Sequence, residues 1–100
     1  MNKFVCIQKP NKTEIRLGDV ENHCDLVLKN EKCSGGGYYK VEEEEKTVIL
    51  WDKSFDYGYP KFTDTNTVDE LWKDYTFYYV PDLFMPLDDC YLINVEFEEL

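Results

Sequence analysis

The sequence contains a single histidine, His23, and none of its four cysteines stands in a Cys-x-x-Cys pair. A serine hydrolase triad built on Ser54 is not expected, because no second histidine exists to activate that hydroxyl. Residues 1–5 carry no export signal, so we expect the cysteines to be reduced thiols. Zinc binding through His23, Cys24 and Cys33 is the less favoured alternative, since the tight ligand spacing of zinc sites is missing. We therefore expect no metal and no cofactor.

Positive charge and long apolar runs are also scarce. Eleven lysines and arginines stand against 21 acidic residues, which gives a formal net charge of −10. Affinity for nucleic acid comes largely from basic residues, so direct binding of DNA or RNA is not expected. The apolar run at residues 48–51 is far too short to span a bilayer, and we expect a cytoplasmic protein with no membrane partner. An acidic chain can instead bind a basic protein partner, or imitate nucleic acid and block a protein that binds it.

The length and composition of the chain fit one domain. One hundred residues suffice for one hydrophobic core but not for two. Hydrophobic residues make up 43% of the chain and aromatic residues 16%, which is typical of a folded globule and not of a disordered acidic tail. We expect a single domain over residues 1–100.

Alternation of apolar and polar residues predicts strands over much of the chain. The expected strands cover residues 3–9, 13–17, 75–80 and 91–97, and a hairpin joins residues 36–41 to residues 47–52. Four glutamates at positions 42–45 fill the turn of this hairpin, where a solvated charge cluster discourages edge pairing. Residues 81–89 are expected to form an irregular connection.

Two short helices complete the expected fold. Asp19 can cap a helix over residues 20–30, in which the apolar residues share one face. Thr67 and Glu70 have the spacing of a capping box, and helical periodicity continues to Tyr75. The sequence therefore predicts an α/β protein of the α+β type, with a mixed, mostly antiparallel sheet and two short helices.

Two glycine-containing corners are the strongest functional signal. Gly35, Gly36 and Gly37 open the expected hairpin, and the segment from Ser54 to Gly58 closes it. Three consecutive glycines at the start of a strand require either positive φ or the close approach of another group. Two such corners at the ends of one hairpin can together form a small, anion-sized pocket.

The order of these motifs resembles the Janus/Ocnus family of phosphohistidine phosphatase-like proteins. The similar segments are KFVCI at residues 3–7, HCDL at 23–26, CSGGG at 33–37 and SFDYGYP at 54–60. A short helix and a tyrosine-rich strand follow in both. The resemblance covers residues 3–80, and residues 81–100 are an addition to it.

The resemblance implies metal-independent phosphoryl hydrolysis, or binding of a phosphorylated protein or a small phosphate ligand. It implies that His23 is the general base or nucleophile and that Lys3 neutralises the phosphate. The implied phosphate donors are main-chain N–H groups around Cys24, Ser54, Phe55 and Asp56, and the implied turn-forming residues are Gly35, Gly36, Gly37 and Gly58. Such roles fit the chemistry, because one histidine with a pKa near neutrality can move the proton that P–N cleavage requires.

The chain also differs from the family. About ten residues are missing between His23 and Gly35, Tyr38 replaces a basic residue, and Asp56 replaces a small residue of the phosphate turn. A carboxylate beside a phosphate dianion costs energy. The alternative is a non-catalytic acidic interaction module or inhibitor, which the net charge and the acidic residues at 96–99 favour.

Overall fold

Strands dominate the fold of the computed structural model, which describes residues 1–81 and 90–97. Only Pro81 of the expected connection at 81–89 is described, and residues 98–100 of the acidic tail lie outside the described part. The strands are β1 (Asn2–Lys9), β2 (Lys12–Asp19), β3 (Lys32–Glu42), β4 (Thr47–Trp51), β5 (Asn66–Val68), β6 (Thr76–Val80), β7 (Tyr91–Ile93) and β8 (Val95–Phe97). Two short 3₁₀ turns, η1 (His23–Leu26) and η2 (Glu70–Trp72), lie between them.

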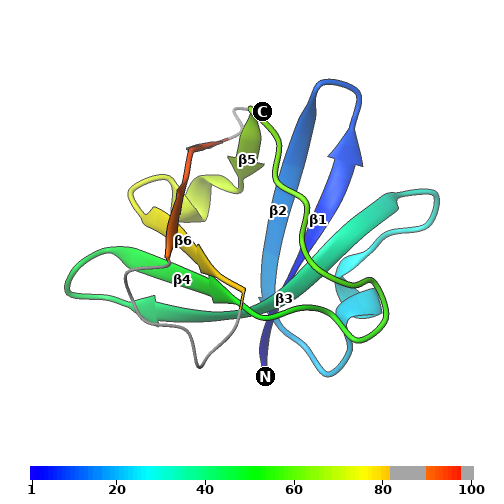
Figure 1. Ribbon diagram of the computed structural model, residues 1–100, viewed down its shortest axis with the longest axis horizontal. Helices are drawn as coiled ribbons and strands as arrows, with labels where there is room; N and C mark the ends of the chain where they lie inside the picture. The colour runs from blue at the N-terminus through cyan, green and yellow to red at the C-terminus, as the bar shows by residue number, and fades with distance from the viewer. Residues whose placement is uncertain (82–89, 98–100) are drawn as a thin grey trace.

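The strands form one sheet in the order β7-β6-β4-β3-β1-β2-β5-β8. Its two edge strands, β7 and β8, are consecutive in the chain, so the sheet curves into a nearly closed barrel (Figure 1). Four strand pairings are antiparallel, and the three pairings β2–β5, β4–β6 and β5–β8 are parallel. The strands expected at residues 3–9, 13–17 and 75–80 and the hairpin are confirmed. The strand expected at 91–97 is broken at Asn94.

The prediction of an α/β fold with two helices is wrong. The described residues form strands, loops and two 3₁₀ turns, and they contain no α-helix. Strand β2 continues through Gly18 and ends at Asp19. In place of the helix expected over residues 20–30, the chain forms the single turn η1. The segment is rich in β-branched, Asn and Asp residues with weak helix propensity. Contacts with β2 and β3 therefore decide its path.

The prediction of a helix that begins after Thr67 is also wrong. Thr67 lies in β5, where the strand pairs in parallel with β2 on one side and β8 on the other. The residue that caps η2 is Asp69, whose carboxylate accepts the N–H of Leu71 at 3.0 Å. Burial of β5 against two neighbouring strands outweighs the local capping signal, and only one turn remains.

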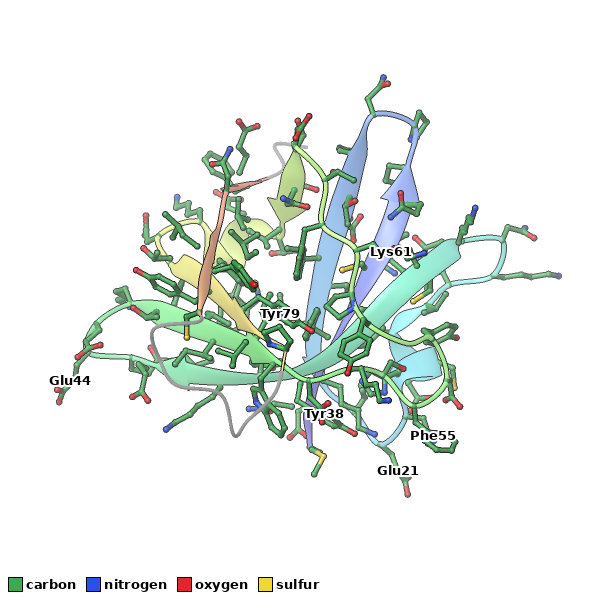
Figure 2. All side chains as sticks on the ribbon, in the orientation of Figure 1. Glu21, Tyr38, Glu44, Phe55, Lys61 and Tyr79 are labelled. Atoms are coloured by element: carbon green, nitrogen blue, oxygen red, sulfur yellow. The ribbon has the colours of Figure 1, made fainter. Side chains whose placement is uncertain are left out.

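The core lies inside the curved sheet. Its buried members are Phe4, Cys6, Ile15, Val48, Leu50, Val68, Phe77 and Tyr79. Tyr79 points into this interior, and its hydroxyl donates to the carbonyl of Asp52 at 2.7 Å (Figure 2). Burial raises the pKa of the Cys6 thiol to about 12, so this cysteine is an inert core residue. No helix in the described residues is long and apolar enough to cross a membrane.

Close backbone packing explains the triple glycine. A Cβ on Gly36 would lie 2.4 Å from the carbonyl oxygen of Phe4, and one on Gly35 would lie 2.0 Å from that of Tyr59. A Cβ on Gly37 would lie 2.4 Å from the carbonyl oxygen of Trp51. Real Cβ atoms do not approach backbone this closely, so neighbouring main chains pack directly on the start of β3. We call Gly35, Gly36 and Gly37 the glycine strip.

Replacement of Gly36 by alanine is expected to lower the free energy of unfolding by about 3 kcal/mol, because the new methyl group meets rigid backbone. Gly58 is the matched control, since its φ is 81° but nothing lies within 4 Å of the place that an added methyl group would take. Gly58→Ala should cost only about 1 kcal/mol, from backbone strain alone. Urea unfolding measures both values, and an equal cost for the two variants would contradict the packing argument.

Candidate functional site

His23 is the first residue of η1, and local hydrogen bonds stabilise this turn. The N–H of Asn22 donates to the carboxylate of Asp25 at 3.0 Å, and the N–H of Val27 donates to the carbonyl of Cys24 at 3.1 Å. The exposed side chain of Cys24 takes no part in these contacts. The turn therefore directs His23 toward the sheet.

An ion-pair network fastens the chain after η1 to β2. Arg16 binds both carboxylate oxygens of Glu31, at 2.6 and 2.9 Å, and also pairs with Glu14 at 2.7 Å. The same guanidinium donates to the carbonyl of Leu26 at 2.7 Å. Hydrogen bonding to Arg16 lowers the pKa of Glu31 to about 2, and hydrogen bonding to Glu31 raises the pKa of Arg16. These contacts set the position of η1 in place of the expected helix.

The imidazole of His23 is buried against the glycine strip, with only 3% of the residue exposed. Its Nε2 lies 2.7 Å from the carbonyl oxygen of Gly37. A carbonyl can only accept, so Nε2 carries the proton and Nδ1 carries the free lone pair. Among the described residues Nδ1 has no hydrogen-bond partner, and it is not a fully buried atom. The ring edge meets Tyr38, with 5.4 Å between the ring centroids.

The surroundings of His23 keep its ring neutral. Burial is the largest effect and lowers the pKa below 6.5, and the positive charge of Lys3 lowers it further. The hydrogen bond to Gly37 and the negative charge of Asp56 act in the opposite direction. Both charged side chains are therefore close enough to act on the ring.

Lys3 projects from β1 beside the ring, but its ammonium group already has a partner. It donates to the backbone carbonyl of Glu21 and lies 6.0 Å from the centroid of the Tyr38 ring. Tyr38 stands where the resemblance implies a basic residue, and the structure places the Lys3 ammonium over that tyrosine. Positive charge is thus kept next to the imidazole.

The segment from Ser54 to Gly58 forms a tight loop. Ser54 and Gly58 exchange two backbone hydrogen bonds of 3.0 and 2.9 Å, and the hydroxyl of Ser54 accepts the N–H of Tyr57 at 3.2 Å. The carbonyl of Gly58 also accepts the N–H of Gly36 at 3.2 Å, so the loop is attached to the glycine strip. Ser54 is buried by these contacts.

The N–H groups of this loop differ in whether they are already hydrogen-bonded. The N–H of Ser54 is bound to Gly58 and is not free to hold a phosphate. The side chain of Phe55 is 96% exposed and points away from the molecule (Figure 2). Within the loop from Ser54 to Gly58, the N–H groups of Phe55 and Asp56 have no partner among the described residues, so they are the donors that this loop can offer.

The structure thus brings together His23, Lys3, the glycine strip and the loop from Ser54 to Gly58. Four cavities between described residues lie elsewhere, and none of these four includes His23 in its lining. No group of three or more His, Cys, Asp or Glu side chains in the described ranges could hold a metal ion.

Sequence reasoning missed three contributors to this site. The carbonyl of Gly37 carries no side-chain signal, and the contact of Tyr38 with the histidine depends on the twist of β3. The pairing of Arg16 with Glu31 joins residues 15 apart across the turn. An arginine in a half-buried strand, opposite an acidic segment, is the one signal that could have revealed it.

Substitution of Arg16 by methionine should lower the free energy of unfolding by about 2 kcal/mol, because the half-buried Glu31 loses its bidentate partner and keeps only the 3.3 Å ion pair with Lys9. The control is Lys40→Met, which breaks the exposed Lys40–Glu42 pair and should cost about 0.5 kcal/mol or less. Urea unfolding of both variants tests this difference. Similar costs would mean that the network does not hold η1.

The stability of the fold should depend on pH through His23. The folded-state pKa of His23 lies below 6.5, so the unfolded chain takes up a proton first as the pH falls. The stability that depends on neutral His23 is complete above pH 6.5 and is lost as the pH falls through the folded-state pKa. Glu31 stays charged down to about pH 2, so it does not titrate in this window.

The measurement is urea unfolding at about pH 7.5 and about pH 5 for the wild type and for His23→Gln, which keeps an N–H donor. The wild type should lose more stability between the two pH values than the variant does. An NMR titration of the ring should give a pKa below 6.5. A pKa at or above that value would contradict the burial argument.

Chemically, the site offers a neutral imidazole with a fixed tautomer, one nearby ammonium group and two unpartnered N–H donors. These groups suit the binding of a small anion and the transfer of a proton beside it. Comparison of the chain with protein-family models, with curated proteins and with solved structures found no match.

Proposed function

We propose that the protein binds a phosphoryl group beside His23 and hydrolyses the P–N bond of phosphohistidine without a metal ion. One observation carries the proposal. The carbonyl of Gly37 accepts a hydrogen bond from the Nε2–H group of His23, so the proton stays on Nε2 and the lone pair of Nδ1 is available at neutral pH. The ordered resemblance to phosphohistidine phosphatase-like proteins supplies the type of substrate.

The reaction needs one proton transfer in each direction. A water molecule attacks phosphorus and forms a P–O bond while Nδ1 of His23 takes its proton. The P–N bond breaks, its electron pair returns to the imidazole of the substrate, and that nitrogen receives the proton from Nδ1 of His23, which restores the neutral ring. A neutral histidine suits this task because it neither needs to lose a proton first nor repels a cationic leaving group.

Charge around the phosphoryl oxygens is only partly balanced. Lys3 and the N–H groups of Phe55 and Asp56 favour the anion. The carboxylate of Asp56 opposes it, since its negative charge is close enough to raise the pKa of His23. The proposed enzyme is therefore a weak one, and removal of this carboxylate should improve it.

The test is hydrolysis of a phosphohistidine peptide by the wild type and by His23→Ala and His23→Gln. Both substitutions should lower kcat/KM by about 10²-fold or more, because they remove the proton acceptor. Asp56→Asn should raise it about three- to tenfold by removing a like charge. Asp74→Asn, an identical change on an exposed residue after η2, is the control and should leave the rate unchanged.

Folding of each variant is checked by circular dichroism before its rate is compared. Equal rates from the wild type and both His23 variants, or no hydrolysis by any of the proteins, would refute the catalytic proposal. Binding is measured separately by NMR titration with inorganic phosphate. Movement of the Phe55 and Asp56 amide signals is expected, and its absence would refute the phosphate site.

A further inference from the structure

Strand β2 has an outer edge that is only partly covered. On its inner side β1 pairs with it from Lys12 to Asp19. On its outer side β5 pairs only with Thr13 and Glu14. In the described part of the chain, no strand pairs with residues 15–19 on this side. Figure 1 shows β5 beside only the end of β2 that lies nearer the β1–β2 turn.

The backbone of this open edge is oriented for pairing. The N–H of Thr13 points away from β1, because it donates to the carbonyl of Thr65 at 2.9 Å. The N–H of Val20 points toward β1, where it donates to the carbonyl of Met1. Main-chain groups of alternate residues share one direction in an antiparallel pair, so Ile15, Leu17 and Asp19 present theirs outward.

A groove runs along the same edge. A cavity of about 450 Å³ lies between residues 14–17 of β2 and residues 69–72. Leu17 and Trp72 are half-buried and give it an apolar side, while Leu71 is 75% exposed at its rim. Outward main-chain groups beside an apolar groove are what an added β-strand requires.

The charges around the groove select the partner. Glu14 and Arg16 line the groove but are paired with each other at 2.7 Å. The acidic groups left to meet a partner are Asp69 and Glu70, of which Glu70 has only an exposed 3.7 Å contact with Lys73. A second copy of the chain would bring a second acidic edge and another net charge of −10 to this groove. Like charges on facing strands repel, so an edge-to-edge dimer is disfavoured and a basic segment is favoured.

We propose that the outer edge of β2 binds an extended, basic segment of a partner protein by strand addition. The segment spans about five residues, the length of the open edge. Its alternate side chains face Leu17 and Trp72, and the intervening basic side chains meet Asp69 and Glu70. The proposal is independent of the phosphate site, and it gives a location for the basic partner that the composition favours.

The probe is a blocked peptide of sequence Lys-Val-Arg-Val-Lys, titrated into the ¹⁵N-labelled full chain. Saturable binding with Kd on the order of 1 mM or tighter is expected. Exchange of the Leu17 amide hydrogen should slow about tenfold or more at saturation, because the added strand hydrogen-bonds to this edge. A peptide with glutamate at every basic position should bind about tenfold more weakly or not at all.

Two matched controls separate strand addition from general charge attraction. Two N-methylated peptides are compared, one methylated at the backbone nitrogens that face β2 and the other at the alternate nitrogens that face away. The first should not bind, and the second should bind like the unmethylated peptide. Glu70→Lys should weaken binding several-fold more than Glu44→Lys, which makes the same charge change at the far tip of the β3–β4 hairpin (Figure 2). The Glu70 variant keeps its fold, since it loses only the exposed pair with Lys73.

Absence of saturable binding, an unchanged Leu17 exchange rate, or equal effects of the two charge changes would overturn the proposal. Equal loss of binding by the two N-methylated peptides would also overturn it. Sedimentation of the free protein is the remaining check. A concentration-dependent dimer with a protected Leu17 amide would show that a second copy occupies the edge instead.

Discussion

The glycine strip is the constraint on which the rest of the structure depends. Carbonyl oxygens of Phe4, Tyr59 and Trp51 all approach it at distances that no side chain would permit. β1, the chain after the Ser54–Gly58 loop and the end of β4 therefore meet at one place. The same bare surface accepts the imidazole of His23, so the packing of the sheet and the geometry of the candidate site have a common origin.

The packing of His23 against the glycine strip determines the chemical character of its ring. Many catalytic histidines are oriented by a carboxylate, which favours the protonated ring. Here a backbone carbonyl orients the ring, and burial with a nearby ammonium group keeps the pKa low. The outcome is a neutral base with a defined tautomer. The negative charge of the exposed Asp56 acts on this pKa in the opposite direction.

The strands were predictable where alternation was strong, as in residues 13–17 and in the hairpin around the acidic turn. The two helices were not, because their outcome depends on distant contacts: Arg16 holds the first segment, and parallel pairing recruits Thr67 into β5. At the site, the resemblance implied that His23, Lys3 and the Ser54 loop act together, and the charges of Lys3 and Asp56 do act on the His23 ring. It did not predict that Ser54 N–H and the Lys3 ammonium are already bound, since both partners are main-chain carbonyls.

The order of the strands has a consequence for how the chain folds. The barrel closes when residues 95–97 dock in parallel on residues 66–68, and the Asn66 side chain donates to the carbonyl of Asn94 there. Such a topology joins segments that are far apart in sequence, so loop entropy must be overcome before the contacts form. Folding should fall in the slow, millisecond-to-second class. Until the last strands arrive, the edge of β5 is open to other nascent or unfolded chains.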